Sequence, residues 1–363
     1  MRIVQIIDSL EAGGAERMAV NYANGLADHV DFSGLIVTRK EGVLLKQISE
    51  KVPYFFLKKK KSLDFLALCR LRKFVSKNKV EVVHAHSTSY FIALLLKLVY
   101  PSVKIIWHDH YGDSEFLDER PTRLLKIALP YFSGILVVNQ KLKNWAIKEL
   151  NFSNSLFLPN FVNEENYFTV VKSAILHGVE GKRIVCLANL RFQKNHFLVL
   201  RMAEKLKKVK LDWTFHLVGK DFKDEYSTAI KKEIIDKGLS ENVFIYDSQS
   251  DIATILEQST IAILSSQSEG LPVALLEYGL HRKPVLVTDV GEIATVVIHG
   301  KNGLVIALED EVLFYDSLLD LINDEVLREQ LGNSFYKTIN EQYNEQIVIK
   351  QYVNWLKLTI KND

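Results

Sequence analysis

Two glutamates eight residues apart mark one segment of this chain as suited to chemistry. Glu269 follows an apolar run and several serines, and Glu277 lies in the helical pattern that comes next. Gly270 lets a ligand approach the backbone, and Pro272 fits the first turn of a helix. Because a carboxylate accepts two hydrogen bonds, it suits the paired hydroxyls of a ribose or another sugar. The segment predicts a sugar-binding site. The structural alternative is one solvated loop glutamate and one on a helix face.

A second segment, 187–196, places Arg191 and Lys194 between an apolar run and a helical pattern. The amino end of a helix carries a partial positive charge, and two nearby cations add to it. Such a loop suits a diphosphate group. The alternative is an ordinary surface loop.

Four histidines end two successive apolar runs. His84 and His86 end the first run, and His108 and His110 end the second. Imidazoles exchange protons and donate hydrogen bonds near neutral pH, so the group predicts a functional site. A metal centre is the weaker alternative, because spacing by two along a strand is loose evidence for ligands. We therefore expect no metal.

Gly13 and Gly14 separate the first apolar run from the first helical pattern. Here the backbone can approach an anion at the amino end of a helix. The segment is neither a G-x-G-x-x-G dinucleotide fingerprint nor a P-loop. The alternative is a tight turn that needs a positive φ.

Parallel strands would bring these segments together, because open parallel sheets bind ligands at the carboxyl ends of their strands. Short runs that are apolar on both faces predict such strands. The first group of runs covers 3–7, 34–37, 54–57, 80–85, 103–107, 135–138 and 155–158. The second group covers 183–188, 213–218, 243–246, 260–264, 284–288 and 303–306. Helical patterns lie between the runs, and a polar linker falls near 160–173. The segment from about 310 onward is predicted to be helical. The sequence thus predicts two successive α/β units.

Composition fits a soluble globular protein of 363 residues and gives no case for nucleic acid, since the net charge is only +2. No leader pattern opens the chain, and its longest apolar run is too short to cross a bilayer. We expect a cytoplasmic protein. Basic residues gather in the first half, above all at 58–61, so contact with the inner face of an anionic membrane is a further expectation. Cys69 and Cys186 are both interpreted as small core residues.

Together these segments resemble the retaining GT-B glycosyltransferases of family 4, and the resemblance covers nearly the whole chain. The stretch from Ser268 to Glu277 is similar to the family's E-x7-E motif. Four further segments support it in register: Gly13-Gly14, 159–162, Lys194-Asn195 and 300–304. The resemblance implies two Rossmann-like domains facing across a cleft. Residues 1–165 would form the acceptor domain, 170–344 the donor domain, and a final helix at about 345–363 would cross back to the first.

The resemblance also implies roles for individual residues. Donor-binding residues would be Gly14, Arg191, Lys194, Glu269, Gly270, Leu271, Pro272 and Glu277. Candidate catalytic residues would be Glu269, His108, Lys194 and Arg191, and acceptor-side residues would be Gly13, His86 and His110. Two departures matter: Asn189 stands where the family commonly has arginine, which Arg191 would replace, and the later glycine-rich motif appears as Gly291-Glu292 followed by Thr295.

The implied reaction is transfer of a hexosyl or N-acetylhexosaminyl residue from a nucleotide-sugar, with UDP favoured, to a glycan or lipid-linked acceptor in surface polysaccharide synthesis. It retains anomeric configuration and needs no metal or other cofactor. Front-face transfer is favoured because no carboxylate nucleophile is evident on the reacting face. Two alternatives stay open at this point: a UDP-sugar 2-epimerase-like enzyme, and a non-catalytic nucleotide-sugar-binding subunit.

Overall fold

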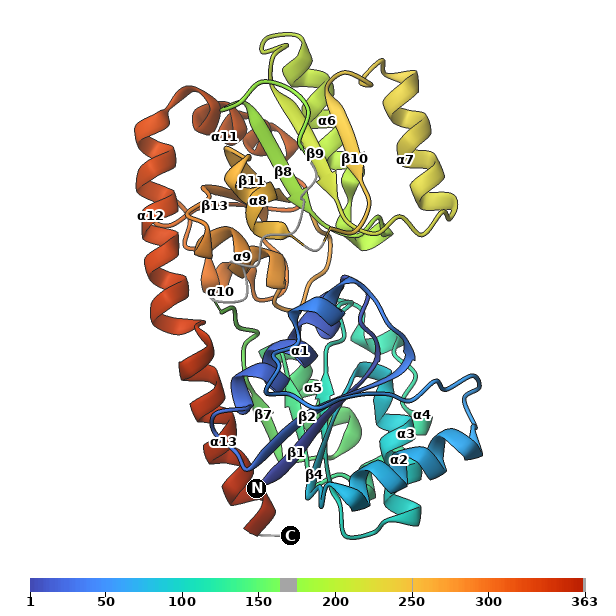
Figure 1. Ribbon diagram of the computed structural model, residues 1–363. Coiled ribbons are helices and arrows are strands. Elements are labelled where there is room, and N and C mark those ends of the chain that lie inside the picture. Colours follow the sequence, from blue (N-terminus) through green and yellow to red (C-terminus); the bar gives the residue numbers. More distant parts are fainter. Residues whose placement is uncertain (164–174, 250, 362–363) are drawn as a thin grey trace. The chain divides into compact units, whose positions relative to one another are not determined.

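The computed structural model describes residues 1–163, 175–249 and 251–361 (Figure 1). The chain divides into two compact units. Unit 1 consists of Met1–Phe161 and Glu345–Asp363, and unit 2 is Val162–Asn344. The final segment of the chain therefore belongs with the first unit. The predicted domain limits at 165 and 170, and most of the predicted linker, lie outside the described residues.

Unit 1 is built on a seven-stranded sheet in the order β3-β2-β1-β4-β5-β6-β7, and all of its strand pairs are parallel. The strand order reverses at β1 and β4, as in doubly wound nucleotide-binding folds. The strands are β1 (Arg2–Ser9), β2 (Phe32–Lys40), β3 (Tyr54–Phe56), β4 (Val82–His86), β5 (Lys104–Asp109), β6 (Gly134–Val137) and β7 (Ser155–Phe157).

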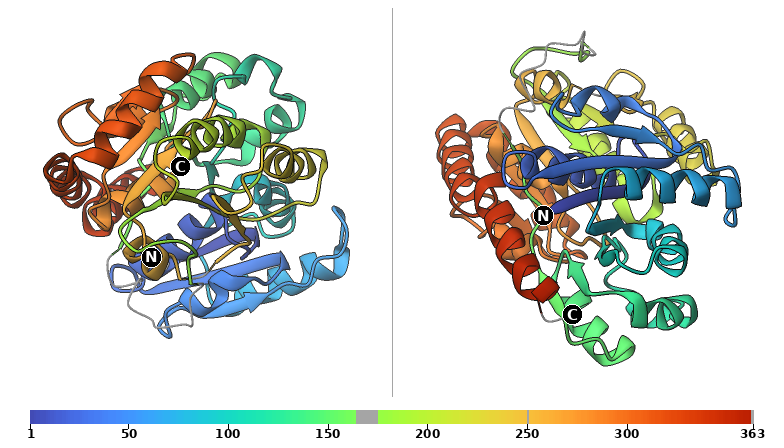
Figure 2. Two further views of the ribbon diagram at one scale, coloured as in Figure 1. Left: turned by 90° about the horizontal axis from the view of Figure 1, so that it is seen from above. Right: turned by 60° about the horizontal axis from the view of Figure 1, so that its bottom comes forward.

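Helices cover both faces of this sheet. Side chains of α2 (Phe65–Lys77), α3 (Tyr90–Val99) and α5 (Gln140–Leu150) pack with inward-facing strand residues in one apolar core. On the opposite face lie α1 (Gly14–Leu26) and α13 (Glu345–Lys361), which run against each other near Gly25 (Figures 1 and 2). The remaining short elements of the unit are η1 (Val43–Gln47), η2 (Ser87–Ser89), η3 (Leu117–Glu119), α4 (Arg123–Ala128) and η4 (Leu129–Tyr131).

Unit 2 repeats the plan with a six-stranded parallel sheet in the order β10-β9-β8-β11-β12-β13. Its strands are β8 (Arg183–Leu187), β9 (Thr214–Val218), β10 (Val243–Tyr246), β11 (Ile261–Leu264), β12 (Val285–Thr288) and β13 (Leu304–Ile306). Its helices are η6 (Phe192–Lys194), α6 (His196–Lys207), α7 (Glu225–Asp236), α8 (Ile252–Glu257), α9 (Val273–Leu280), α10 (Ile293–Val296), α11 (Glu311–Asn323) and α12 (Glu325–Gln342).

The predicted α/β class with two parallel sheets is confirmed, and every run predicted as a strand overlaps an observed one. The core position predicted for Cys69 is wrong, whereas Cys186 is buried on β8. The reason is helix geometry: Leu68 and Leu71 of α2 face the sheet. Cys69 is rotated by about 100° from Leu68, toward solvent. Among the described helices, none has the length and apolar character needed to span a membrane.

Candidate active site

The two segments singled out in the second half of the sequence meet in unit 2. Strands β8 and β11 are direct neighbours in its sheet, where the strand order reverses. The loop 188–195 leaves the carboxyl end of β8, and the loop 265–272 leaves the carboxyl end of β11. Ligands of doubly wound sheets bind at this reversal point. The fold therefore brings one predicted cation, Lys194, and one predicted carboxylate, Glu269, to one place.

Lys194 and Glu269 form the centre of this place. The Nζ of Lys194 lies 2.5 Å from Oε1 of Glu269, and the Oγ of Ser266 donates a hydrogen bond of 2.6 Å to the same oxygen. The Glu269 side chain is 6% exposed, and that of Lys194 is 21% exposed. Burying a carboxylate to this degree costs free energy unless a partner charge and hydrogen bonds compensate it. Lys194 and Ser266 supply both.

Backbone contacts hold the two loops in register. The Oγ of Ser265 donates to the carbonyl oxygen of Lys194 at 2.9 Å, and the N–H of Gln267 donates to the carbonyl oxygen of Gln193 at 2.8 Å. From the next strand, the Oγ1 of Thr288 donates to the carbonyl oxygen of Ser266 at 2.6 Å. The serines that looked like a simple polar stretch in the sequence thus fix the position of Glu269.

The backbone of Gly291 packs closely against the backbone of the Glu269 loop. Its φ of +59° lies in the left-handed region. A Cβ at this position would overlap the carbonyl oxygen of Glu269 and lie 2.7 Å from that of Gly270. The next residue, Glu292, donates its N–H to the Gly270 carbonyl at 3.0 Å. Only glycine combines this backbone conformation with this close approach.

Glu277 lies in the helix α9, which begins just after the Glu269 loop. Pro272 caps the amino end of α9, and Glu277 is inside that helix with only 4% of its surface exposed. The neighbouring Tyr278 anchors α9 to the sheet, since its hydroxyl accepts from the N–H of Leu187 at 2.6 Å. The structure thus places a second carboxylate on a helix that starts directly after the Glu269 loop. Gly270 and Leu271, between Glu269 and the cap, are buried as well.

Arg191 has a different environment from Lys194. Its guanidinium lies 4.5 Å from the ring centroid of Phe222, and its side chain is exposed. Asn189, at the position where the resemblance leads one to expect arginine, accepts a hydrogen bond of 2.8 Å from the N–H of Lys220. Asn189 therefore tethers the 219–223 loop. The replacement of the missing arginine by Arg191 stays a prediction.

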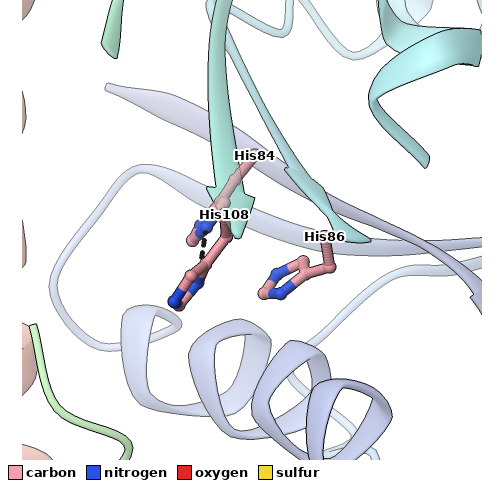
Figure 3. Close-up of side chains that lie close together, drawn as sticks. All are labelled: His84, His86 and His108. Atoms are coloured by element: carbon pink, nitrogen blue, oxygen red, sulfur yellow. Dashed lines mark hydrogen bonds between the residues drawn. The ribbon is translucent and has the colours of Figure 1, made fainter. Parts of the chain in front are cut away.

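In unit 1, the four histidines form one group. His84 and His86 project from β4, and His108 projects from the adjacent β5, toward the helix α1 (Figure 3). His86 Nδ1 lies 2.9 Å from His110 Nε2, and His84 Nε2 lies 3.2 Å from His108 Nδ1. Burial lowers the pKa of all four imidazoles, that of His110 to about 3. They are therefore neutral at physiological pH.

Three of these side chains also satisfy a distance criterion for metal binding. One ring nitrogen each from His84, His86 and His108 falls within 4.8 Å of the other two. In the described structure, however, the histidine nitrogens face one another in pairs, and His86 Nε2 faces Gln5 Oε1 at 2.9 Å. The arrangement is that of a hydrogen-bonded network.

The glycine pair lies at the amino end of α1, as predicted. Gly13 is the cap residue and Gly14 is the first residue of the helix. The alternative of a turn with positive φ is wrong for Gly13, because its φ of −164° is extended backbone. The atoms nearest to a Cβ there belong to the carboxylate end of Glu16, a flexible side chain that can move away. Neither backbone strain nor close packing therefore requires glycine at this position.

The sequence analysis missed a buried ion pair formed by Asp109, which lies between His108 and His110 in the sequence. Arg120 contacts Asp109 through two hydrogen bonds of 2.6 and 2.9 Å. The guanidinium also lies over the rings of Tyr111 and Trp145, at 4.2 and 4.4 Å from their centroids. This pair ties the loop after β5 to the sheet. An acidic residue at the end of an apolar strand was the available signal.

Two families match the chain side by side. The family described as Glycosyltransferase Family 4 matches residues 12–166, and the family described as Glycosyl transferases group 1 matches residues 168–338. The two matches follow one another along the chain and meet between residues 166 and 168, a few residues after the boundary between Phe161 and Val162 that separates the two units.

Individual relatives match over most of their length. A UDP-Gal:alpha-D-GlcNAc-diphosphoundecaprenol alpha-1,3-galactosyltransferase of Escherichia coli is 25% identical over 84% of this chain and 84% of its own. The amylovoran biosynthesis glycosyltransferase AmsD of Erwinia amylovora is 22% identical, over 97% of this chain and 98% of its own.

Among solved structures, the Anabaena protein HepE, determined in complex with UDP and glucose, superposes with a TM-score of 0.80 at 14% identity. The alignment covers 98% of this chain and 99% of HepE. The fold is thus the GT-B fold. Two consecutive family matches, full-length relatives and two Rossmann-like units together show that the chain is a glycosyltransferase of family 4.

Proposed function

We propose that this enzyme transfers a hexosyl or N-acetylhexosaminyl residue from a UDP-sugar to a glycan or lipid-linked acceptor, with retention of anomeric configuration. The observation that carries the proposal is the pairing of Lys194 with Glu269 at the reversal point of the second sheet, on a loop that leads directly into the helix of Glu277. A cation and two buried carboxylates in one unit match the three parts of the donor: diphosphate, sugar and ribose.

Each group has a chemical task in this proposal. The carboxylate of Glu277 accepts hydrogen bonds from the two ribose hydroxyls. The Lys194 ammonium, with Arg191 from the same loop, offsets the charge of the diphosphate. Glu269 and the backbone of Gly270, Leu271 and Pro272 bind hydroxyls of the transferred sugar. In unit 1, we assign His108 to the transferred sugar, Gly14 to the donor, and Gly13, His86 and His110 to the acceptor.

The bond changes of front-face transfer balance without a protein nucleophile. The bond from the anomeric carbon to the diphosphate oxygen breaks, and a bond from that carbon to the acceptor oxygen forms on the same face. The acceptor proton passes to the departing diphosphate. The increase in negative charge on the diphosphate is what Lys194 stabilises, since a fixed cation in a partly buried site acts strongly on developing charge. The proposal requires no resident metal.

The names of the relatives support the substrate classes. The Escherichia coli relative is named for UDP-galactose and a diphosphoundecaprenol acceptor, and the Erwinia relative for amylovoran biosynthesis. HepE was crystallised with UDP and glucose. A UDP-sugar donor and a lipid-linked or polysaccharide acceptor are therefore the substrates we propose for this chain.

A donor screen tests the proposal. Thermal unfolding is followed with UDP-, GDP- and ADP-sugars in the presence of EDTA, because a ligand that binds the folded state raises the apparent stability. We expect stabilisation by one or more UDP-sugars, followed by sugar transfer to an undecaprenyl-diphosphate-linked acceptor. Epimerisation of the donor without an acceptor would contradict the proposal. So would tight donor binding without any transfer.

Unit 1 carries a surface suited to a membrane-bound acceptor. The segment before α2 exposes Lys58, Lys60, Lys61 and Leu63, and the first turn of the helix exposes Phe65 and Leu66, at 76% and 69%. The helix stands at the outer edge of its unit (Figures 1 and 2). Exposed apolar side chains among lysines combine insertion between lipids with attraction to anionic headgroups. We propose that this surface contacts an anionic membrane.

Vesicle sedimentation checks this contact. The enzyme should sediment with phosphatidylcholine vesicles that contain phosphatidylglycerol, and remain in solution with phosphatidylcholine alone. A double variant, Phe65→Ser with Leu66→Ser, should bind at least about tenfold more weakly because it loses the inserted apolar area. The matched control is Val209→Ser with Leu211→Ser, which replaces two apolar residues of unit 2 with exposure similar to that of Phe65 and Leu66. Equal loss in both variants, or no binding by the wild type, would contradict the proposal.

A further inference from the structure

The first sheet has a polar face and an apolar face. Side chains alternate between the two faces along each strand. Val4 and Val83 point to one face and belong to the apolar core under α2 and α3. The opposite face carries Gln5 and His84, which are register partners on β1 and β4, and, two residues further along, His86 and His108, which are register partners on β4 and β5. Such a layer of imidazoles inside a domain is costly unless each polar atom has a partner. The hydrogen-bond partners of these rings therefore decide what the layer does.

One chain of contacts links the last helix of the protein to this layer. The hydroxyl of Tyr352, on α13, lies 2.9 Å from His84 Nδ1, and His84 Nε2 lies 3.2 Å from His108 Nδ1. All three side chains are buried. His108 Nε2, at the far end of the chain of contacts, has no hydrogen-bond partner among the described residues.

The rings of His84 and His108 face each other end to end. Their centroids are 5.2 Å apart and their planes differ by 17°, while the two facing nitrogens are 3.2 Å apart (Figure 3). Both nitrogens thus lie close to the line that joins the ring centres. This is the geometry of one N–H donating to one bare nitrogen.

The chain of contacts has a defined proton order. Burial lowers the pKa of His84 and His108 and raises the pKa of Tyr352, so all three groups are neutral. A neutral imidazole has one N–H and one bare nitrogen. The phenol O–H is the better donor of the first pair, and in the reverse order its proton would be buried without an acceptor. Tyr352 therefore donates to His84 Nδ1, His84 Nε2 donates to His108 Nδ1, and the His108 proton is on Nε2.

We infer that Tyr352 is a positioning residue, which acts through His84 to hold His108 as the tautomer protonated on Nε2. The unpaired N–H is then offered to an oxygen of the bound substrate, a sugar hydroxyl or a phosphate oxygen. This last assignment rests on the proposed function, whereas the tautomer itself does not. The C-terminal helix thus contributes to the chemistry of unit 1, in addition to packing against it.

A second chain of contacts serves as an internal reference. Gln5 Oε1 faces His86 Nε2, and His86 Nδ1 faces His110 Nε2, both at 2.9 Å. Because the Gln5 oxygen only accepts, His86 is protonated on Nε2 and accepts on Nδ1 from His110. This second pair does not involve Tyr352, so its tautomers should stay unchanged when Tyr352 is altered.

Nitrogen-15 NMR of the full-length protein, labelled at histidine, tests the inference without any substrate. A protonated ring nitrogen resonates far upfield of a bare one, so each tautomer is read directly. We expect His108 to carry its proton on Nε2. In Tyr352→Phe, His84 loses its donor, and His108 should become a mixture of both tautomers. Wild-type His108 protonated on Nδ1, or an unchanged spectrum in Tyr352→Phe, would overturn the inference.

Tyr22→Phe is the matched control. Tyr22 is fully buried on α1, its ring centroid is 5.1 Å from that of Tyr352, and its hydroxyl has no partner among the described residues. Both variants remove a buried phenol hydroxyl, but Tyr22→Phe leaves the hydrogen bonds from Tyr352 to His84 and from His84 to His108 in place. The His108 tautomer and kcat should stay as in the wild type, whereas Tyr352→Phe should lower kcat about three- to tenfold and change donor KM less than twofold.

The failures of the two proposals are distinguishable. A His108 proton fixed on Nε2 in a protein that transfers no sugar would contradict only the proposed function. Normal transfer by Tyr352→Phe together with an unchanged tautomer would contradict only the inference. If Tyr352→Phe does not fold, the wild-type spectrum alone still decides the tautomer.

Discussion

Lys194→Ala should lower kcat for sugar transfer about 100- to 1000-fold. The ammonium that offsets the charge on the departing diphosphate is removed, and the buried Glu269 loses its ion-pair partner. Steady-state kinetics with the donor from the screen measure the effect. A melting temperature determined in parallel shows that the variant is folded. Near-normal turnover in a folded Lys194→Ala protein would contradict its assignment to the diphosphate.

Lys232→Ala is the matched control for this prediction. Lys232 is also in unit 2 and also pairs with a carboxylate, that of Asp236 one turn along α7, and both side chains are exposed. Exposed ion pairs of this kind contribute little to stability. We expect its kcat to stay within about twofold of the wild type. A similar loss of kcat in both variants would contradict a specific role of Lys194 at the diphosphate.

Gly291→Ala should destabilise the protein by about 2–4 kcal/mol and abolish donor binding. The added methyl group strains a backbone with φ of +59° and collides with the carbonyl oxygens of Glu269 and Gly270. The Glu269 loop then shifts away from Lys194. Urea unfolding measures the first effect, and calorimetric titration with UDP measures the second. Wild-type affinity in the variant would contradict the supporting role of Gly291.

Gly300→Ala separates backbone strain from collision. Gly300 has a φ of +72°, but a Cβ there has no atom within 4 Å. The substitution should cost about 1 kcal/mol from strain alone and leave UDP affinity unchanged. The difference between the two alanine variants therefore measures the close contact with the Glu269 loop.

Local pattern was sufficient to predict the elements and part of the site. Parallel strands buried on both faces leave continuous apolar runs, so both sheets were readable from the sequence. Lys194 and Glu269 were predicted to lie together because both follow strands that the fold makes neighbours.

The side-chain hydrogen bonds of the site could not be predicted from the sequence, because they join residues that are distant in sequence. Ser266 and Thr288 fix the Glu269 loop, and the ring of Tyr352 reaches His84 from the far end of the chain. No periodicity encodes such pairs. Gln5, a polar residue between apolar ones in β1, was a local sign of a polar layer under α1, in addition to the histidines that end the next two apolar runs.

The central claim is that unit 2 binds the nucleotide of the donor through Glu277. Calorimetric titration of UDP into the wild type and into Glu277→Ala tests it most directly, with Glu311→Ala, which removes a surface carboxylate, as control. Loss of a charged hydrogen-bonding group predicts UDP binding about 10- to 100-fold weaker in Glu277→Ala, with unchanged binding in the control. Equal affinity of the wild type and Glu277→Ala would contradict the account.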